Sequence, residues 1–95
     1  MTALVLIDLT IHDLPAMARY EGETLAVAAR FGGRPLAKDL QPEIVEGSWS
    51  PTWLVVLEFP SRQAVRDFYA APDYQPLKAL RQAAATSNGL IVVGD

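Results

Sequence analysis

Three apolar runs along the chain have the length and composition of β-strands. Residues 3–9 and 52–59 are rich in β-branched and leucine residues, and residues 90–93 form a shorter run of the same kind. Turn-forming residues bound these runs, which favours strands over buried helices. A fourth extended region is predicted in two pieces, 34–38 and 43–46, which together indicate one broken or bulged strand.

The segments between the predicted strands carry apolar residues at helical spacing. The first helix is predicted to begin after Asp13, which can cap it, and to end at the glycines 32–33. Its regularly spaced positions are Met17, Tyr20, Thr24, Val27 and Phe31. A second helix is predicted after the capping residue Ser61, and a third helical segment follows Asp73 as its cap and ends at residues 87–89.

The order of these elements is β-α-β-β-α-β, which is the split βαβ or ferredoxin-like arrangement of an α+β protein. In this fold the helices cover one face of a four-stranded antiparallel sheet. A chain of 95 residues has the size of one domain, and no linker or repeat divides it. We therefore expect residues 1–95 to form a single domain.

The predicted strands are apolar on both faces. Alternate residues of a strand point to opposite faces, and both sets in 3–9 and 52–59 are apolar apart from Asp8 and Glu58. The helices can cover only one face, and a large exposed apolar patch is rare on a monomer. We therefore expect a homodimer in which two sheets pack face to face. The alternative is a monomer whose second face is covered by residues 39–51.

The composition and charge of the chain exclude several classes of function. Apolar residues make up 51% of the chain and charged residues 20%, which excludes a disordered chain. The net charge of -3 provides no basic surface, so no nucleic-acid partner is expected. There is no cysteine and one histidine, so we expect no disulfide and no metal site. The apolar runs are too short for a signal peptide or a membrane span, and we expect a cytoplasmic protein without a bound cofactor.

The chain resembles a known family over nearly its whole length. The residues that carry the resemblance are Tyr20, Gly32-Gly33, Glu46-Gly47-Ser48-Trp49, 54–61, Phe68-Tyr69, Pro72-Asp73-Tyr74-Gln75 and Leu77-Lys78-Ala79-Leu80-Arg81. They are similar to the family named domain of unknown function 1330, within the dimeric α/β-barrel superfamily. The resemblance implies the ferredoxin-like fold and a dimer with paired sheets, whereas the function of the family is unassigned. Its superfamily includes cofactor-independent monooxygenases, haem-degrading enzymes and small-molecule isomerases.

Two carboxylates interrupt the apolar strand faces and are candidates for acid/base chemistry. If the two strands are antiparallel neighbours, Asp8 and Glu58 lie four residues apart along the sheet, roughly 13 Å. A catalytic carboxylate pair works at about 5 to 9.5 Å, so a shared mechanism is excluded. Glu58 is expected to lie close to Arg81, whose guanidinium can bind a carboxylate through two hydrogen bonds. That pair is either a structural ion pair or a means of holding Arg81 so that its remaining donors bind an anionic ligand.

Four further side chains are candidates for lining a pocket between the helices and the sheet, and a fifth is a candidate for the subunit interface. The hydroxyls of Tyr20, Tyr69 and Tyr74 could bind a ligand there, although each ring is equally suited to the core. His12 lies where the first strand joins the first helix; it is either a proton acceptor or an exposed loop histidine. Trp49 belongs to a turn, and we expect it to contact the partner subunit rather than to pack on its own domain.

These observations support two hypotheses of function. One is a small homodimeric enzyme that is independent of a cofactor and acts on a small organic acid or aromatic compound. In that case His12 or Glu58 accepts a proton, and Arg81 or Tyr20 holds the ligand. The other is a non-catalytic module of the same fold for metabolite binding or assembly. The sequence contains no Gly-rich phosphate loop and no nucleophile elbow that would identify a reaction.

Overall fold

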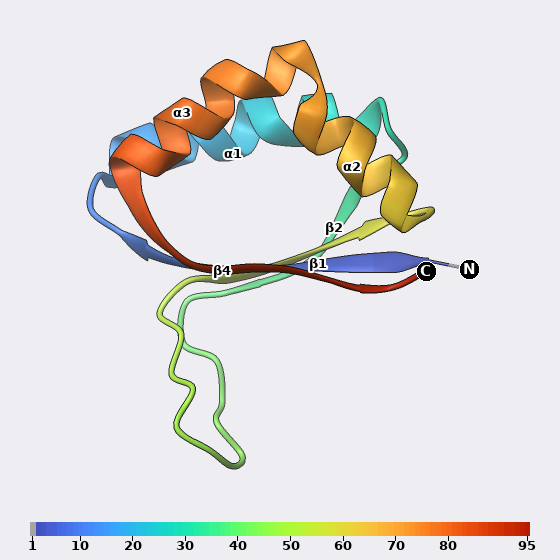
Figure 1. Cartoon of the computed structure of the whole chain (residues 1–95). Helices are drawn as coiled ribbons and strands as arrows, with labels where there is room; N and C mark the ends of the chain where they lie inside the picture. Colours follow the sequence, from blue (N-terminus) through green and yellow to red (C-terminus); the bar gives the residue numbers. More distant parts are fainter. Residues whose placement is uncertain (1) are drawn as a thin grey trace.

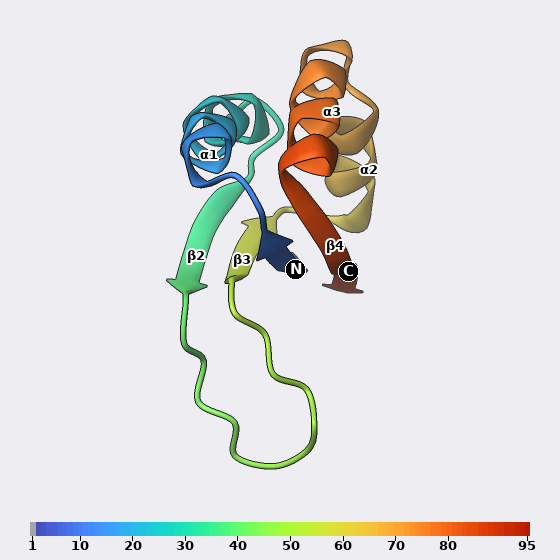
Figure 2. The same ribbon diagram turned by 90° about the vertical axis from the view of Figure 1, so that its left-hand side faces the viewer.

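The computed structural model describes residues 2–95 and has one sheet beneath a layer of helices (Figure 1). Its elements in chain order are β1 (Ala3–Ile11), α1 (Leu14–Ala29), β2 (Arg34–Asp39), β3 (Leu54–Phe59), α2 (Arg62–Ala70), the 3₁₀ turn η1 (Pro72–Tyr74), α3 (Gln75–Ala84) and β4 (Ala85–Gly94). The four strands are antiparallel in the order β2-β3-β1-β4. The three α-helices lie on one face of the sheet, with α1 on one side and α2 and α3 on the other (Figure 2). This confirms the predicted α+β ferredoxin-like fold.

Local capping explains where the first two helices begin. The side chain of Asp13 accepts a hydrogen bond from the Ala16 amide at 3.1 Å, and Ser61 Oγ accepts one from the Ala64 amide at 3.0 Å. Both predicted caps are therefore confirmed. The predicted cap Asp73 is wrong: α3 follows the turn η1, in which the Tyr74 amide donates to the Ala71 carbonyl, and no side chain caps it. Asp73 instead forms an ion pair with Arg30, beyond the end of α1.

Two predicted strand boundaries are wrong. Residues 43–46 are not a strand; β2 ends at Asp39, and its irregularity is a shift of register between Pro35 and Ala37. Residues 87–89 do not separate the last helix from the last strand. They lie within β4, where a bulge opposite Asp8 and Leu9 accommodates the extra residue. Pairing with β1 extends this strand into residues that, taken locally, favour a turn.

The core lies between the sheet and the helices. Alternate residues of β1 and β3 point into it and are buried, among them Val5, Ile7, Leu57 and Phe59. Gly33, after the end of α1, lies so close to the sheet that a Cβ atom there would be 2.6 Å from the Phe59 ring. The close approach of chain and ring therefore requires glycine at this position.

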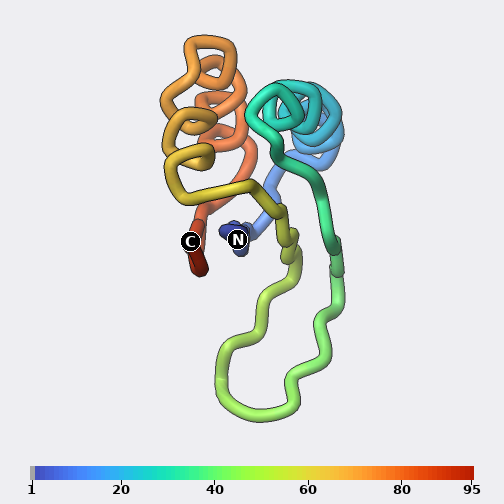
Figure 3. Tube along the Cα trace, turned by 90° about the vertical axis from the view of Figure 1, so that its right-hand side faces the viewer, coloured from blue at the N-terminus to red at the C-terminus, as the bar shows by residue number. Residues whose placement is uncertain are grey.

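The other side of the sheet, which we call the open face, is not covered by a helix. It carries apolar side chains from β1, β3 and β4, namely Leu4, Leu6, Leu54, Val56, Ile91 and Val93. The loop of residues 41–52, which we call the arm, projects away from the sheet on this side (Figures 1 and 3). None of the helices in residues 2–95 is long and apolar enough to cross a membrane.

Candidate functional site

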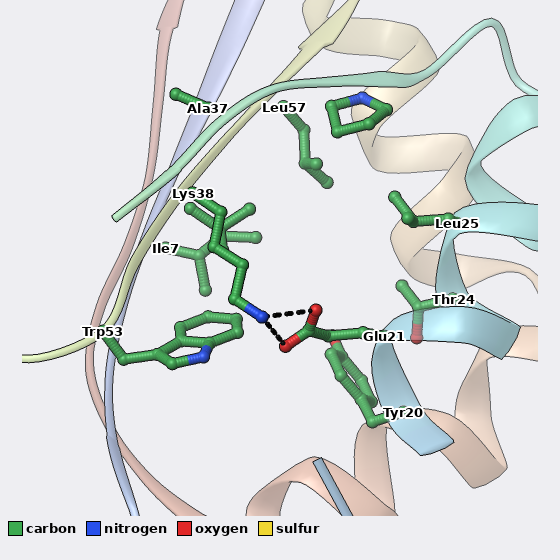
Figure 4. Close-up of a pocket in the computed structure, with 11 residues that line it drawn as sticks. Ile7, Tyr20, Glu21, Thr24, Leu25, Ala37, Lys38, Trp53 and Leu57 are labelled. Carbon is green, nitrogen blue, oxygen red and sulfur yellow. Dashed lines mark hydrogen bonds and ion pairs between the residues drawn. The ribbon is translucent and has the colours of Figure 1, made fainter. Parts of the chain in front are cut away.

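A mainly apolar cavity lies between the helices and the sheet. Its main chamber has a volume of about 460 Å³, within the usual range for small-molecule sites. A side chamber of about 110 Å³ lies between α1 and β2 (Figure 4). The two chambers share Ile7, Tyr20, Thr24 and Leu57 as lining residues, so they adjoin each other. The cavity is therefore built by the inward faces of the same elements that form the core.

Two tyrosines form a hydrogen-bonded pair in the wall of the main chamber. The hydroxyls of Tyr20 in α1 and Tyr74 in η1 are 2.7 Å apart, and both side chains are buried. Burial raises the pKa of both tyrosines above the ordinary value for a phenol, and it raises that of Tyr74 strongly. Both hydroxyls are therefore neutral near pH 7, and neither can serve as a base there. One hydroxyl donates to the other, so the pair has one O–H left to donate to a ligand.

Thr24 contributes a further polar atom to the cavity. It lines both chambers and is buried, and its Oγ1 makes no hydrogen bond of normal geometry among the described residues, although it lies close enough to the Tyr20 hydroxyl to lower the pKa of that phenol. Buried hydroxyls nearly always have a partner, because an unpaired one loses its hydrogen bonds to water. The unpaired hydroxyl of Thr24 therefore provides a free donor and acceptor inside an apolar space.

Arg81 is buried near the tyrosine pair and has no carboxylate partner. Only 2% of it is exposed, its Nη1 donates to Ser87 Oγ at 3.5 Å, and its Nε has no partner. Its charge acts on both Tyr20 and Tyr74, where it lowers the pKa against the larger effect of burial. The guanidinium does not line either chamber and lies within the core beneath α3.

The predicted proximity of Glu58 and Arg81 is wrong. Glu58 lies on the open face, where its Oε1 accepts hydrogen bonds from Arg34 at 2.7 and 2.8 Å. Its neighbours Leu57 and Phe59 point into the core, so the alternation of side chains along β3 sends Glu58 to the side away from Arg81. The predicted separation of Asp8 and Glu58 is confirmed, because Leu4 pairs with Glu58 and Asp8 pairs with Leu54.

The other candidate residues lie in different places. His12 is exposed, and its Nε2 is 2.7 Å from Thr86 Oγ1; it does not line the cavity. Tyr69 does line the main chamber and is 38% exposed, with its ring 5.5 Å from that of Tyr74. The structure thus brings the three tyrosines together at the cavity, whereas His12, Glu58 and Arg81 are not among its lining residues.

Trp49 connects the arm to the open face. Its indole N–H donates to Asp8 Oδ2 at 2.7 Å, and the amide of Asn88 donates to Asp8 Oδ1 at 3.3 Å. The contact with its own domain is partial, since Trp49 remains 52% exposed. Contact between Trp49 and a partner subunit stays a prediction.

A second polar group, which the sequence analysis did not identify, lies at the side chamber. Lys38 Nζ in β2 donates to both carboxylate oxygens of Glu21 in α1, at 2.8 and 2.9 Å, and lies 5.7 Å from the centre of the Trp53 ring (Figure 4). This ion pair links α1 to the edge strand across the chamber. Only the packing of α1 on β2 brings the two residues together, so no local pattern could identify them.

We expect the substitution Lys38→Met to speed the association of an apolar probe with the cavity. Loss of the link to Glu21 frees α1 from β2 at the side chamber, while the free energy of unfolding changes by less than about 1 kcal/mol because the pair is partly exposed. Stopped-flow fluorescence with the neutral probe N-phenyl-1-naphthylamine measures the rate. Arg19→Met, which removes an exposed ion pair with Glu23, is the matched control. Equal rates in both variants would contradict a role of the Lys38 pair in access.

No group of three or more metal-ligating side chains occurs in residues 2–95. The ionisable residues that line the two chambers are Glu21, Lys38, Arg66 and the three tyrosines. The arrangement can therefore bind an apolar body and direct several hydrogen-bond donors at its polar groups.

Comparison with solved structures gives proteins of the same fold. A protein of unknown function from Rhodopseudomonas palustris, RPA0582, has a TM-score of 0.82 at 20% identity, covering 97% of this chain and 80% of that one. SnoaB, a cofactor-independent oxygenase from Streptomyces nogalater, has a TM-score of 0.69 at 17% identity, covering 99% and 92%. A Dabb family protein with a ferredoxin-like fold from Mesorhizobium loti has a TM-score of 0.59 at 10% identity, covering 97% and 92%.

At these identities the likeness is one of fold alone, and it is the fold of the dimeric α/β barrels. Comparison with curated protein sequences finds no match. A family model described as a domain of unknown function, DUF1330, matches residues 2–95, and the chain therefore belongs to the DUF1330 family.

Proposed function

We propose that the cavity binds a small organic molecule with a largely apolar, aromatic body, and that the protein transforms this molecule without a bound cofactor. The observation that carries the proposal is the unpaired hydroxyl of Thr24, buried in an apolar space beside the hydroxyls of Tyr20 and Tyr74. Apolar pockets with a few convergent polar groups are typical of small-molecule sites. A structural neighbour described as a cofactor-independent oxygenase supports the reaction class.

The residues of the cavity suit a substrate that carries an oxygen atom. The pair of Tyr20 and Tyr74 has one O–H that is not used between the two residues, and this O–H can donate to a substrate oxygen and stabilise negative charge that develops on it. Thr24 can donate or accept at a second position on the same molecule. His12 and Glu58 have no part in this proposal, because they lie outside the cavity and a proton acceptor must reach the substrate.

A second candidate function is the binding of such a molecule without chemistry. It is favoured by one observation: the carboxylate that lines the cavity, Glu21, is already paired with Lys38, and the tyrosines are poor bases. The two functions share the ligand site and differ only in turnover. Oxygen consumption with hydroxylated aromatic compounds distinguishes them, since a binding module changes neither the compound nor dissolved oxygen.

The substitution Thr24→Val tests the site. Valine has nearly the same shape and removes an unpaired buried hydroxyl, so we expect the free energy of unfolding to rise by about 1 kcal/mol. Binding of a hydroxylated aromatic compound should weaken about tenfold, since one hydrogen bond is worth about 1 kcal/mol or more. A panel of such compounds, followed by thermal shift and calorimetry, measures both effects.

Thr52→Val is the control for this substitution, because Thr52 is exposed and lies outside both chambers. It should change neither stability nor affinity appreciably. Unchanged affinity in Thr24→Val, with compounds that bind the wild type, would contradict the proposed site.

We also propose that the protein is a homodimer through its open face. The face is apolar, no helix covers it, and the arm projects away from the sheet instead of lying over it (Figure 2). The arm adds exposed apolar side chains on the same side, namely Ile44 and Val45. Proteins of this fold family are typically dimeric, which supports the proposal.

A further inference from the structure

The main chamber opens to solvent between α2 and the edge strand β4, over which α2 lies (Figure 2). Its lining residues from β1, α1, β3 and η1 are all buried. The exposed lining residues are Arg66, Tyr69 and Ala70, and all three belong to α2. On the other side of the opening, Leu90 and Val92 of β4 are half-buried. We call the opening bounded by these five residues the mouth.

Arg66 is the charged side chain at the mouth, and it has no carboxylate partner. No Asp or Glu is among the residues that line the main chamber, and the ion pairs formed by residues 2–95 do not include Arg66. Its Nη1 donates to Gln63 Oε1 at 3.0 Å, and Gln63 Nε2 donates in turn to Asp67 Oδ1 at 2.9 Å. A guanidinium has five N–H donors, so Arg66 presents spare donors at the mouth.

A second cation lies beside the mouth. Lys78 Nζ in α3 is 4.8 Å from the centre of the Tyr69 ring, which is within the range of a cation–π interaction. Lys78, like Arg66, takes part in none of the ion pairs of the described residues. The mouth is therefore locally positive, although the chain as a whole has a net charge of -3.

The inner end of the main chamber offers hydroxyl groups instead of charges. Tyr20 and Thr24 line the side chamber as well, and Tyr20 is hydrogen-bonded to Tyr74. None of the five residues of the mouth lines the side chamber, so these hydroxyls lie at the end where the two chambers adjoin. The main chamber thus has a cationic mouth, an apolar middle and neutral hydroxyls at its inner end.

We propose that the molecule bound in the main chamber is an organic acid that keeps its carboxylate at the mouth, where Arg66 binds it, and places its apolar body inside. A carboxylate at the mouth stays partly hydrated and so avoids the cost of burying a charge, and a guanidinium can bind both of its oxygens. A hydroxyl or carbonyl group at the opposite end of the molecule reaches Thr24 and the tyrosine pair. This inference rests on the proposed small-molecule site and adds the charge and the orientation of its ligand.

The test compares 6-hydroxy-2-naphthoate with 6-hydroxy-2-naphthamide, which have nearly the same shape and differ in charge. Calorimetry with the wild-type protein near neutral pH and at low ionic strength gives both affinities. We expect the acid to bind about fivefold more tightly, as for a partly solvated ion pair, and this preference to shrink when salt is added. Equal affinities would overturn the inference and leave the chamber as a ligand site. Binding of neither compound would overturn both this inference and the proposed function.

Substitution of Arg66 assigns the preference to this side chain. Arg66 is exposed, so Arg66→Gln should keep the wild-type melting temperature and the affinity for the amide while it removes the preference for the acid. Arg19→Gln is the matched control, because Arg19 is an exposed arginine of α1 that pairs with Glu23 and lies outside the main chamber. An unchanged preference in Arg66→Gln, or an equal loss in Arg19→Gln, would overturn the assignment to Arg66.

The orientation of the ligand is tested with 2-naphthoate, which lacks the hydroxyl group. Arg66→Gln should weaken the binding of 2-naphthoate and 6-hydroxy-2-naphthoate alike, since both carry the carboxylate. Thr24→Val should weaken the binding of 6-hydroxy-2-naphthoate more than that of 2-naphthoate, since only the former has a group for the inner end. The reverse pattern, or an equal effect of Thr24→Val on the two acids, would overturn the proposed orientation.

Discussion

Leu6→Glu is expected to convert the proposed dimer to a monomer at micromolar concentrations. Leu6 lies on the central strand β1, with Val56 and Ile91 as its neighbours across the sheet, so it is at the middle of the open face. A carboxylate buried there in a sheet-to-sheet interface would be desolvated with no partner, which costs several kcal/mol. A loss of about 4 kcal/mol corresponds to a roughly 10³-fold weaker dimer. Sedimentation velocity over a concentration series measures the change.

The folded monomer should tolerate Leu6→Glu, because Leu6 is only partly buried within one chain. Circular dichroism verifies that the fold persists. Leu14→Glu, at the exposed start of α1 on the helical side, introduces the same charge at a position that is 71% exposed and should leave the dimer intact. A wild-type protein that sediments as a monomer, or a Leu6→Glu variant that dimerises as tightly as wild type, would contradict the proposed interface.

Most of the fold could be predicted because its signals are local. Asp13 and Ser61 cap helices through hydrogen bonds to amides three residues away, and both are visible in the sequence. The apolar alternation of the strands follows from backbone geometry in the same way. Residues 43–46 and 87–89 could not be assigned correctly. Whether such a segment joins a sheet depends on the strand beside it: β1 pairs with 87–89, and nothing pairs with 43–46.

The candidate site also combines residues that the sequence could indicate with contacts that depend on how distant segments pack. Tyr20 and Tyr74 stood out as amphipathic aromatic residues, but their hydrogen bond joins positions 54 residues apart and depends on how α1 packs near η1. Lys38 and Glu21 meet only because β2 lies beside α1. Glu58 could not be placed from the sequence alone, because β3 is apolar on both faces and only the packing of the helices shows that Leu57 and Phe59 face inward.

We expect the free energy of unfolding to fall steeply above about pH 10 because of the tyrosine pair. Burial raises the pKa of Tyr20 and Tyr74 in the folded protein, whereas the unfolded chain ionises them near their ordinary value of 10.0. The stability that their protonated forms confer is complete below that pH and is lost as the pH rises toward the folded values, because only the unfolded state releases the protons. Each tyrosine contributes a slope of about 1.4 kcal/mol per pH unit, and the two together about 2.7 kcal/mol per unit.

A slope of this size per pH unit is a substantial fraction of a total stability of about 5–15 kcal/mol, so the loss of stability above about pH 10 should be measurable. Urea unfolding at a series of pH values gives the slope, and tyrosinate absorbance should appear together with unfolding rather than before it. Tyr20→Phe and Tyr74→Phe should each remove about half of the slope, whatever they do to stability at neutral pH, and the double variant should remove this contribution entirely. Single variants with the wild-type slope would show that burial does not hold the two hydroxyls protonated. That result would also contradict the description of the pair as a neutral donor at the ligand site.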